Sequence, residues 1–226
     1  MSSAERVDVA GLEVLDLGCG LGGPSLELVR THGAKRVLGL DVEQGVLQGA
    51  GQAAAAAGLA DRVSFKLVQP GPLPLADRSF DLVFSKDALT EVKDKKEIYA
   101  EVLRVLRPGG WFVASDWLQG DRAGSDRFRE WVKLALVPFN MASLGETARL
   151  LAEVGFVEVE VRSRNAWYQA EARRELARMA GPLWPRLVEA RSEAAARRSL
   201  AFWRMMIEVL DSGEFCPAHI RARKPL

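Results

Sequence analysis

The stretch from residue 14 to residue 23 has the sequence Val14-Leu15-Asp16-Leu17-Gly18-Cys19-Gly20-Leu21-Gly22-Gly23. The stretch Glu13–Leu17 predicts a β-strand, and a helix is expected to begin at about Gly23 and to continue to Thr31. Glycines between two such elements let the backbone turn sharply and approach a ligand closely. The same residues satisfy Gly-x-Gly-x-x-Gly, the fingerprint of dinucleotide-binding sheets, so the spacing predicts a nucleotide site without selecting the nucleotide.

Strands and helices alternate along the chain after this loop. Short runs rich in β-branched residues predict strands at 36–42, 63–68, 80–85, 111–115 and 156–161. Helices are expected through 52–57, at 94–106 with Asp94 as N-cap and Pro108–Gly110 as terminator, and at 143–154. This alternation predicts an α/β fold, with a parallel sheet covered by helices on both faces.

The last part of the chain has a different character. From Asn165 to Leu210 the sequence is helical and rich in Trp and Arg, and Pro217–Lys224 predicts a final edge strand after a turn at Ser212–Glu214. We therefore expect one domain over residues 1–226, with a helical insertion on the substrate side at about 165–211.

Composition excludes several classes of protein. Lys and Arg number 31 against 30 Asp and Glu, so the chain lacks the basic excess of a general nucleic-acid binder. Its two cysteines, Cys19 and Cys216, have no metal-ligand spacing, and no apolar run is long enough to span a bilayer. We expect a cytoplasmic protein that binds a small molecule, with no metal, nucleic acid or membrane partner; the oligomeric state stays open.

Asp16 helps to select the nucleotide. A dinucleotide places an anionic pyrophosphate at the glycine loop, and a carboxylate two residues before Gly18 opposes that anion. S-adenosylmethionine (AdoMet) instead carries an ammonium and a sulfonium, which the same carboxylate favours. Asp41, at the end of the second expected strand, can accept hydrogen bonds from both ribose hydroxyls of either nucleotide. The alternatives are that Asp16 only binds turn amides and that Asp41 only caps the next helix.

Four segments occur in the order found in class I AdoMet-dependent methyltransferases: Asp16–Gly23, Asp41, Phe80–Ser85 and Leu106–Gly110. The chain resembles that family over roughly residues 12–118. The resemblance implies a Rossmann-like sheet of seven strands, mostly parallel, with an antiparallel last strand. It also implies that AdoMet is bound by Asp16, Gly18, Cys19, Gly20, Asp41, Val42, Gln69 and Ser85.

Gln69 stands where many members of the family have an acidic residue for the adenine amine. Its amide oxygen can accept the same hydrogen bond with less charge assistance, or it can be a plain turn residue before Pro70.

The stretch from Phe84 to Lys95 resembles a narrower subgroup, the N-methyltransferases of small amines such as phosphoethanolamine, glycine, sarcosine and dimethylglycine. Asp87 matches an aspartate of that subgroup, whereas Glu91 stands where the subgroup has histidine. The subgroup also has a longer N-terminal segment that closes over the cofactor, and this chain begins only 12 residues before Glu13. The resemblance implies a small-amine acceptor, and both departures bear on which amine it is.

Two carboxylates are the catalytic candidates. We expect Asp87, beyond the fourth strand, to position a cationic amine, and Glu91 to relay its proton. The alternatives are that Asp87 caps a helix and that Glu91 is a solvated charge beside Lys93, Asp94 and Lys95.

Further residues are candidates for the acceptor. Asp116 follows the fifth strand at the same sheet edge, and Arg162 or Arg164 can bind an anionic end. Trp167 can face a methylated ammonium, with Tyr168 beside it. Ordinary packing and surface charge are the alternatives. His32 and His219 lie far from the motifs in sequence and suggest no triad or metal site.

Three functions fit these patterns. The first is a methyltransferase acting on a small molecule, with an amine preferred and an O- or S-acceptor of a natural-product pathway as the alternative. The second is a dinucleotide oxidoreductase, disfavoured by Asp16 and by the lack of a Tyr-x-x-x-Lys or histidine relay. The third is a protein that binds AdoMet without catalysis.

Overall fold

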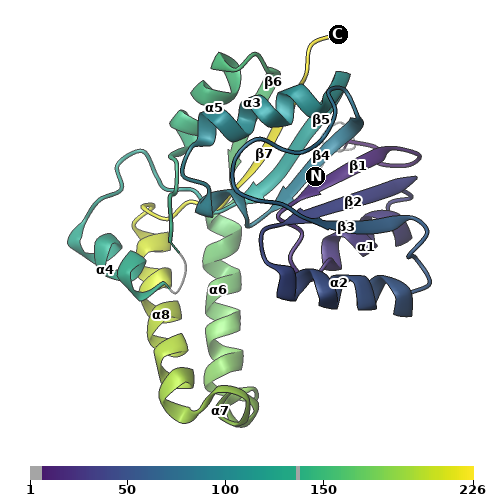
Figure 1. Cartoon of the computed structure of the whole chain (residues 1–226). Helices are drawn as coiled ribbons and strands as arrows, with labels where there is room; N and C mark the ends of the chain where they lie inside the picture. The colour runs from purple at the N-terminus through teal and green to yellow at the C-terminus, as the bar shows by residue number, and fades with distance from the viewer. Residues whose placement is uncertain (1–6, 136–137) are drawn as a thin grey trace.

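The computed structural model describes residues 7–135 and 138–226 (Figure 1). In chain order its elements are β1 (Glu13–Leu17), α1 (Gly23–Arg30), β2 (Arg36–Asp41), α2 (Gln44–Ala56), β3 (Val63–Leu67), β4 (Phe80–Lys86), the 3-10 helix η2 (Leu89–Glu91), α3 (Lys95–Val105), β5 (Leu106–Asp116), α4 (Asp126–Leu134), α5 (Leu144–Glu153), β6 (Val157–Ser163), α6 (Asn165–Ala180), α7 (Trp184–Arg191), α8 (Glu193–Asp211) and β7 (Ala218–Arg223).

The seven strands form one sheet in the order β3-β2-β1-β4-β5-β7-β6. β1 to β5 pair in parallel, and β7 runs antiparallel to both β5 and β6. The expected Rossmann-like sheet with an antiparallel last strand is confirmed. The expectation that Pro217–Lys224 forms an edge strand is wrong, because β7 inserts between β5 and β6 and leaves β6 at the edge.

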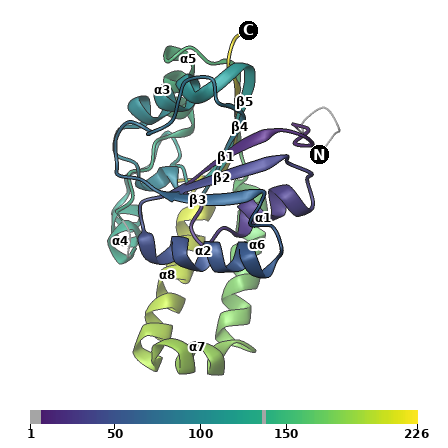
Figure 2. The ribbon, with the colours of Figure 1, turned by 45° about the vertical axis from the view of Figure 1, so that its right-hand side comes forward.

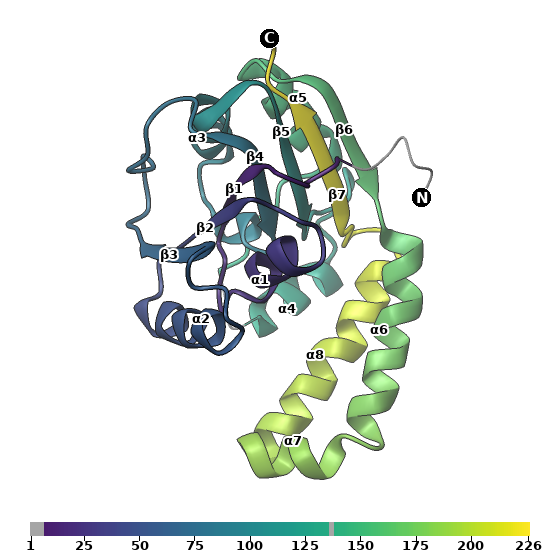
Figure 3. The ribbon, with the colours of Figure 1, turned by 90° about the vertical axis from the view of Figure 1, so that its right-hand side faces the viewer.

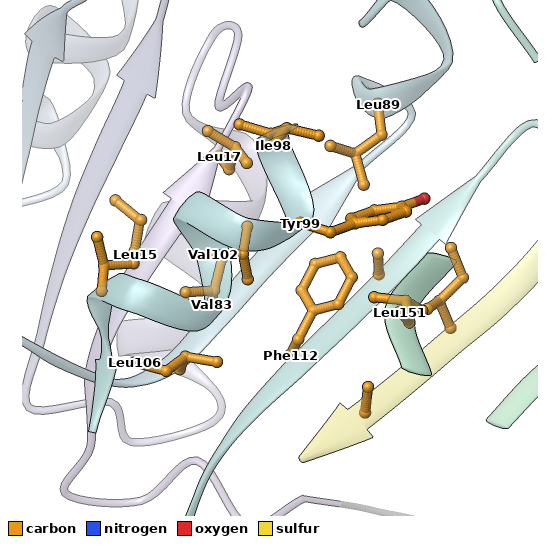
Figure 4. Packing of buried hydrophobic residues seen from close by; sticks show 14 of the residues in the cluster. Leu15, Leu17, Val83, Leu89, Ile98, Tyr99, Val102, Leu106, Phe112 and Leu151 are labelled. Atoms are coloured by element: carbon orange, nitrogen blue, oxygen red, sulfur yellow. The ribbon is translucent and has the colours of Figure 1, made fainter. Parts of the chain in front are cut away.

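Alternating residues of the central strands feed two cores on opposite faces of the sheet. Leu15 and Phe112 point to the face covered by α3 and α5, where Tyr99 and Leu151 pack against them (Figure 4). Val14 and Val37 point to the other face, under α1 and α2. Because β1 is covered on both faces, its residues are buried continuously from Val14 to Leu17 rather than in alternation.

A helical lobe extends from the carboxyl edge of the sheet. α6 and α8 pack as an antiparallel pair with α7 at their far end, and α4 packs against α8 (Figures 2 and 3). The base of this lobe contains a third apolar cluster centred on Trp131 and Phe215. Among the described residues, no helix is both long enough and apolar enough to cross a membrane.

Two local features depart from the sequence-based expectations. α3 ends at Val105, and β5 begins at Leu106 with a register shift before Trp111, so Arg107–Gly110 interrupts a strand rather than ending a helix. Helix α4 was not expected; its start is marked by Ser125, whose hydroxyl oxygen accepts from the Phe128 amide. The Asp94 N-cap is confirmed, since its carboxylate accepts from the Glu97 amide at 2.9 Å.

Candidate functional site

The glycine loop lies at the point where the strand order reverses. β1 has β2 on one side and β4 on the other, and ligands of such sheets bind outside the carboxyl ends of the strands at this switch point. The loop is anchored to β2, because the Gly18 and Cys19 amides both donate to the Leu40 carbonyl oxygen, at 2.9 and 3.0 Å. The remaining edge of the loop faces the ligand side of the sheet.

Steric constraints show which glycines the loop requires. Gly18, Gly20 and Gly22 all have positive φ, at 76°, 51° and 76°. A Cβ on Gly18 would lie 2.2 Å from the Ala88 Cβ, and one on Gly22 would lie 2.6 Å from the Phe65 ring. Gly23 has open space around it and no positive φ. The glycines that the backbone requires are therefore spaced Gly-x-Gly-x-Gly, and the third glycine of the dinucleotide fingerprint has no packing role here.

Asp41 lies at the end of β2, directly beside the loop. One carboxylate oxygen, Oδ2, accepts from the Gly20 amide at 2.8 Å, and Oδ1 accepts from the Glu43 amide at 3.0 Å. Each oxygen keeps a lone pair for a further donor. Three apolar side chains near this carboxylate in the chain or the sheet are exposed: Leu21, Val42 and Leu67. A polar acceptor among exposed apolar groups suits a nucleoside, whose ribose is polar and whose base has flat apolar faces.

Asp16 is buried, with 1% of its surface exposed, and its Oδ2 accepts from the Ser25 hydroxyl of α1 at 2.5 Å. Burial is the main cause that raises the pKa of this carboxyl to about 6; the Ser25 hydrogen bond opposes the shift and Asp41 adds to it. A carboxylate buried in this way can influence a ligand through its charge without touching it. Its expected alternative partner, a turn amide, is replaced by a side-chain hydroxyl.

Three other residues expected to bind the cofactor lie at the same edge. Cys19 is buried, and burial raises the pKa of its thiol to about 12, so the residue presents its backbone rather than a thiolate. The buried Ser85 hydroxyl donates to the Leu17 carbonyl oxygen at 2.8 Å and joins β4 to β1. Gln69 is exposed and follows Val68, whose amide donates to the Asp41 carbonyl oxygen.

Asp87 has unusual backbone geometry directly after β4. Its φ is 54°, which non-glycine residues rarely adopt, and its amide donates to the Ser115 carbonyl oxygen at 2.8 Å. The carboxylate oxygen Oδ2 pairs with Lys86, whereas Oδ1 is buried without a hydrogen-bond partner. Strained backbone together with an unpaired buried oxygen is typical of functional sites.

Glu91 lies in η2 and is exposed. The pKa of its carboxyl is raised, first by partial burial and then by the negative charges of Glu43 and Asp41. These two negative charges belong to residues on the glycine-loop side of the sheet edge, Asp41 at the end of β2 and Glu43 at the start of α2.

Asp116 ends β5 on the other side of Asp87 and is 2% exposed. Its Oδ1 accepts from the Trp117 amide at 2.8 Å. Burial raises the pKa of this carboxyl to about 7, the hydrogen bond and the charge of Lys95 oppose the shift, and Asp87 adds to it.

The start of α6 brings three expected acceptor residues to this edge. Arg164 lies with its guanidinium carbon 5.7 Å from the centre of the Trp167 ring, and its Nε is buried without a hydrogen-bond partner. Trp167 is 50% exposed and already stacks with that guanidinium. Burial is the main cause that raises the pKa of the Tyr168 hydroxyl to about 12, and the negative charge of Asp87 is the second.

Trp117 and His219 also belong to this edge, although neither was among the sequence-based site candidates. Trp117 follows Asp116 and packs on Phe215, with ring centres 5.1 Å apart. His219 pairs with Ser115 across β5 and β7, and burial lowers the pKa of its imidazole with Arg164 as the second cause. The position of Trp117 directly after the fifth strand could have placed it at this edge. To place His219 there, the order of the strands in the sheet had to be known.

The site can therefore hold a nucleoside on the β2 side and a second molecule beside Asp87, Asp116 and Tyr168. Among the described residues, no group of histidine, cysteine and carboxylate side chains is arranged to hold a metal ion. The residues brought together suit positioning and charge stabilisation.

Comparison with known proteins gives the family. The profile of a methyltransferase domain family matches residues 8–169. Sterol 24-C-methyltransferase ERG6B of Gibberella zeae is 38% identical over 116 residues, covering 51% of this chain and 30% of that enzyme. Phosphoethanolamine N-methyltransferase 1 of Arabidopsis thaliana is 27% identical over 169 residues, covering 75% of this chain and 33% of that protein. The chain thus spans about a third of the length of these relatives.

A solved structure shows the same fold. Phosphoethanolamine N-methyltransferase 2 of Haemonchus contortus, bound to phosphomonomethylethanolamine and S-adenosylhomocysteine, superposes with a TM-score of 0.89 at 22% identity, covering 98% of this chain and 50% of the other. The profile match includes the glycine loop, the carboxylates Asp41, Asp87 and Asp116, and the start of α6. The chain therefore belongs to the methyltransferase domain family, as its motifs predicted.

Proposed function

We propose that the protein transfers the methyl group of AdoMet to the nitrogen of a small-molecule amine. The observation that carries this proposal is the Asp87 carboxylate, whose buried Oδ1 has no hydrogen-bond partner. Asp87 immediately precedes Ala88, which touches Gly18 of the glycine loop. A cationic amine that pairs with Oδ1 would therefore lie beside the place where the loop holds the donor.

The donor is assigned to the β2 side of the switch point. Asp41 would accept from the ribose hydroxyls, Gln69 from the adenine amine, and Leu21 and Val42 would cover the apolar faces of the adenosine. The backbone of Gly18–Gly20 would face the methionine part, where the field of Asp16 favours its positive charges. When bound, AdoMet supplies an electrophilic methyl group. The protein's own contribution is alignment, which can supply roughly 7–11 kcal/mol.

The acceptor has to lose a proton before it can act as a nucleophile. An amine with a pKa near 10.4 costs about 4.6 kcal/mol to deprotonate at pH 7. Asp87 attracts the cation and orients it, but the same charge holds the proton on the nitrogen. We therefore assign Asp87 to positioning of the amine and Glu91 to acceptance of its proton. The pKa of Glu91 is raised, which makes it a better base than an ordinary carboxylate.

The surroundings of Asp87 fit a cationic acceptor in a second way. Tyr168 lies close enough for the Asp87 charge to raise its pKa, and Trp117 lies beside it. Aromatic faces next to a carboxylate stabilise methylated ammonium groups by cation–π attraction. Trp167, which stacks with Arg164, is less available for this role than the sequence suggested. Arg164, with its unpartnered Nε, is the candidate for an anionic end of the acceptor, and Asp116 borders the same space.

A second candidate is methylation of an apolar natural product on oxygen or carbon. The observation that favours it is the aromatic cluster of the lobe, in which Trp117, Phe139 and Met141 are only partly buried. An apolar acceptor could pack there, and the relative ERG6B is named as a sterol methyltransferase.

The test is an incubation of the purified protein and AdoMet with two panels, one of small primary to tertiary amines and one of apolar hydroxylated compounds, analysed by mass spectrometry. Methylated products from the amine panel support the proposal, and loss of these products in Asp87→Asn with retention in the exposed control Asp126→Asn ties them to Asp87. Methylated products from the apolar panel alone would favour the second candidate. AdoMet binding without a product from either panel would favour a non-catalytic role.

A further inference from the structure

Lys95 is a buried lysine at a place where a helix does not need one. It is the first residue of α3, directly after the Asp94 N-cap, and it is 7% exposed. A cation in the first turn opposes the helix dipole, and burial of an ammonium is costly unless it is paired. Its neighbour Lys96 is exposed and forms an ordinary surface ion pair with Glu153 at 3.2 Å. Helix stability therefore does not explain why Lys95 turns inward.

The Lys95 ammonium holds one particular turn. Its Nζ donates to the Leu89 and Val92 carbonyl oxygens, each at 2.5 Å. These two carbonyls lie at the first residue of η2 and at its C-cap, so one cation closes both ends of the 3-10 turn. Charge-assisted hydrogen bonds of this kind are stronger than neutral ones.

This turn lies between the proposed donor half and the proposed acceptor half of the site. Asp87 and Ala88 directly precede this turn, and Ala88 lies against Gly18 of the glycine loop. Glu91 is the last residue of the turn, and the charges of Glu43 and Asp41 act on it. The Thr90 carbonyl oxygen also accepts from the Asn140 amide at 2.8 Å, which joins the turn to the segment after α4. A shift of this turn would move both acidic candidates at once.

Lys95 also acts on the buried carboxyl of Asp116. The charge of Lys95 opposes the burial that raises the Asp116 pKa, and Asp116 in turn opposes the burial that lowers the Lys95 pKa. The other titratable groups that act on Asp116 or are acted on by it are Asp87 before η2, Tyr99 of α3 and Tyr168 of α6. Glu146 of α5 acts on Lys95 in the same direction as Asp116. Lys95 is the positive charge that acts on Asp116.

We propose that Lys95 is a positioning residue of the methyl-transfer site, fixing the turn between Asp87 and Glu91. The proposal rests on the proposed function for its catalytic consequence. Its structural part, the control of the turn, stands on the two carbonyl contacts and on the burial of Lys95.

The test compares Lys95→Met with Lys96→Met, which removes an adjacent exposed cation, and with Lys95→Arg, which keeps the charge. The first readout is the titration of Asp116 followed by carboxyl-carbon NMR, with Asp116→Asn used to assign the signal. The second is hydrogen exchange of the amides from residue 87 to residue 92. Neither readout requires turnover or an identified acceptor.

Lys95→Met should raise the pKa of Asp116 and speed exchange in the turn by about tenfold or more, while Lys96→Met leaves both unchanged. Lys95→Arg should restore most of the Asp116 titration. If the protein turns over an acceptor, Lys95→Met should lower kcat roughly tenfold at pH 7, with a smaller change in the KM for AdoMet. An unchanged Asp116 titration and unchanged exchange in folded Lys95→Met would overturn the proposal. If Lys95→Met does not fold, failure of Lys95→Arg to keep the wild-type exchange of the turn overturns it instead. Absence of AdoMet binding by the wild type would count against the proposed function and leave these two readouts standing.

Discussion

Gly18 and Ala88 touch across the carboxyl edge of the sheet, so that a Cβ on Gly18 would lie 2.2 Å from the Cβ of Ala88. The contact joins the loop after β1 to the segment after β4, two neighbouring strands at the switch point. The donor half and the acceptor half of the proposed site therefore meet at a place where no side chain fits on the loop.

Gly18→Ala should weaken AdoMet binding by at least about tenfold and destabilise the fold by about 1–2 kcal/mol or more. Both the overlap with Ala88 and the positive φ of 76° oppose a side chain. The measurement is isothermal titration calorimetry with AdoMet, together with thermal unfolding. Gly23→Ala is the matched control, because Gly23 has neither constraint. Equal losses in the two variants would show that the dinucleotide spacing, rather than Gly-x-Gly-x-Gly, is the one the loop requires.

Asp41→Ala should weaken AdoMet binding by roughly 10- to 100-fold, because it removes the ribose acceptor and releases the Gly20 amide from its 2.8 Å hydrogen bond. Calorimetry measures the change. The control is Asp61→Ala, which removes an exposed carboxylate just before β3, at the end of the strand away from the glycine loop. This variant should bind AdoMet like the wild type. Wild-type affinity in Asp41→Ala would remove Asp41 from the cofactor site.

Asp87→Asn should raise the KM for an amine acceptor by roughly tenfold or more while the Kd for AdoMet stays within about twofold, because it removes a charge that only the acceptor uses. Asparagine tolerates the positive φ of 54° at this position, so the fold should be kept. Steady-state kinetics with the acceptor found in the amine panel gives both values. A KM that does not change, with a lower kcat, would instead make Asp87 a group of the transition state.

Asp16 links AdoMet binding to pH. A cationic ligand favours the ionised carboxylate, and burial raises the pKa of Asp16 to about 6, so ligand binding releases a proton below that pH. Affinity for AdoMet should rise about tenfold between pH 5 and pH 7 and level off above pH 7. Calorimetry at several pH values tests this, and an affinity that falls with rising pH would contradict the assigned sign.

The same shift makes a prediction about stability. A carboxyl whose folded pKa is raised binds more protons in the folded state, so its contribution to stability is lost as pH rises from about 4 to about 6. Asp16→Asn should therefore be more stable than the wild type at pH 7, by up to about 3 kcal/mol, while binding AdoMet more weakly. Urea unfolding at pH 4 and pH 7 checks the difference. A variant less stable than the wild type at pH 7 would show that the Ser25 contact outweighs the cost of burial.

The parts of the fold that could be predicted are those in which local sequence and tertiary structure agree. β1 and the start of α1 follow from an apolar run and a glycine loop, and the Asp94 cap follows from one side chain. The bounds of β5 could not be predicted, because Pro108 and the glycines after it are typical helix terminators and only the pairing of Leu106 with Phe80 shows that the strand has begun. The position of β7 inside the sheet depends on strand order, which no local pattern encodes.

The candidate site divides in the same way. The placement of the loop glycines beside Asp41 was predictable, because it depends on the ends of two neighbouring strands. Lys95 was not, since one lysine among several carries no signal until the structure shows that it turns inward. The contrast between Trp167 and Tyr168 likewise depends on the rotation of α6, which leaves one aromatic ring half exposed and brings its neighbour to Asp87.

The most direct test of the whole account is calorimetric titration of the purified protein at pH 7 with AdoMet and, in parallel, with NAD. Because Asp16 places negative charge beside the glycine loop, the protein should bind AdoMet with measurable heat and give no saturable signal with NAD. Saturable binding of NAD without binding of AdoMet would contradict the account at its base.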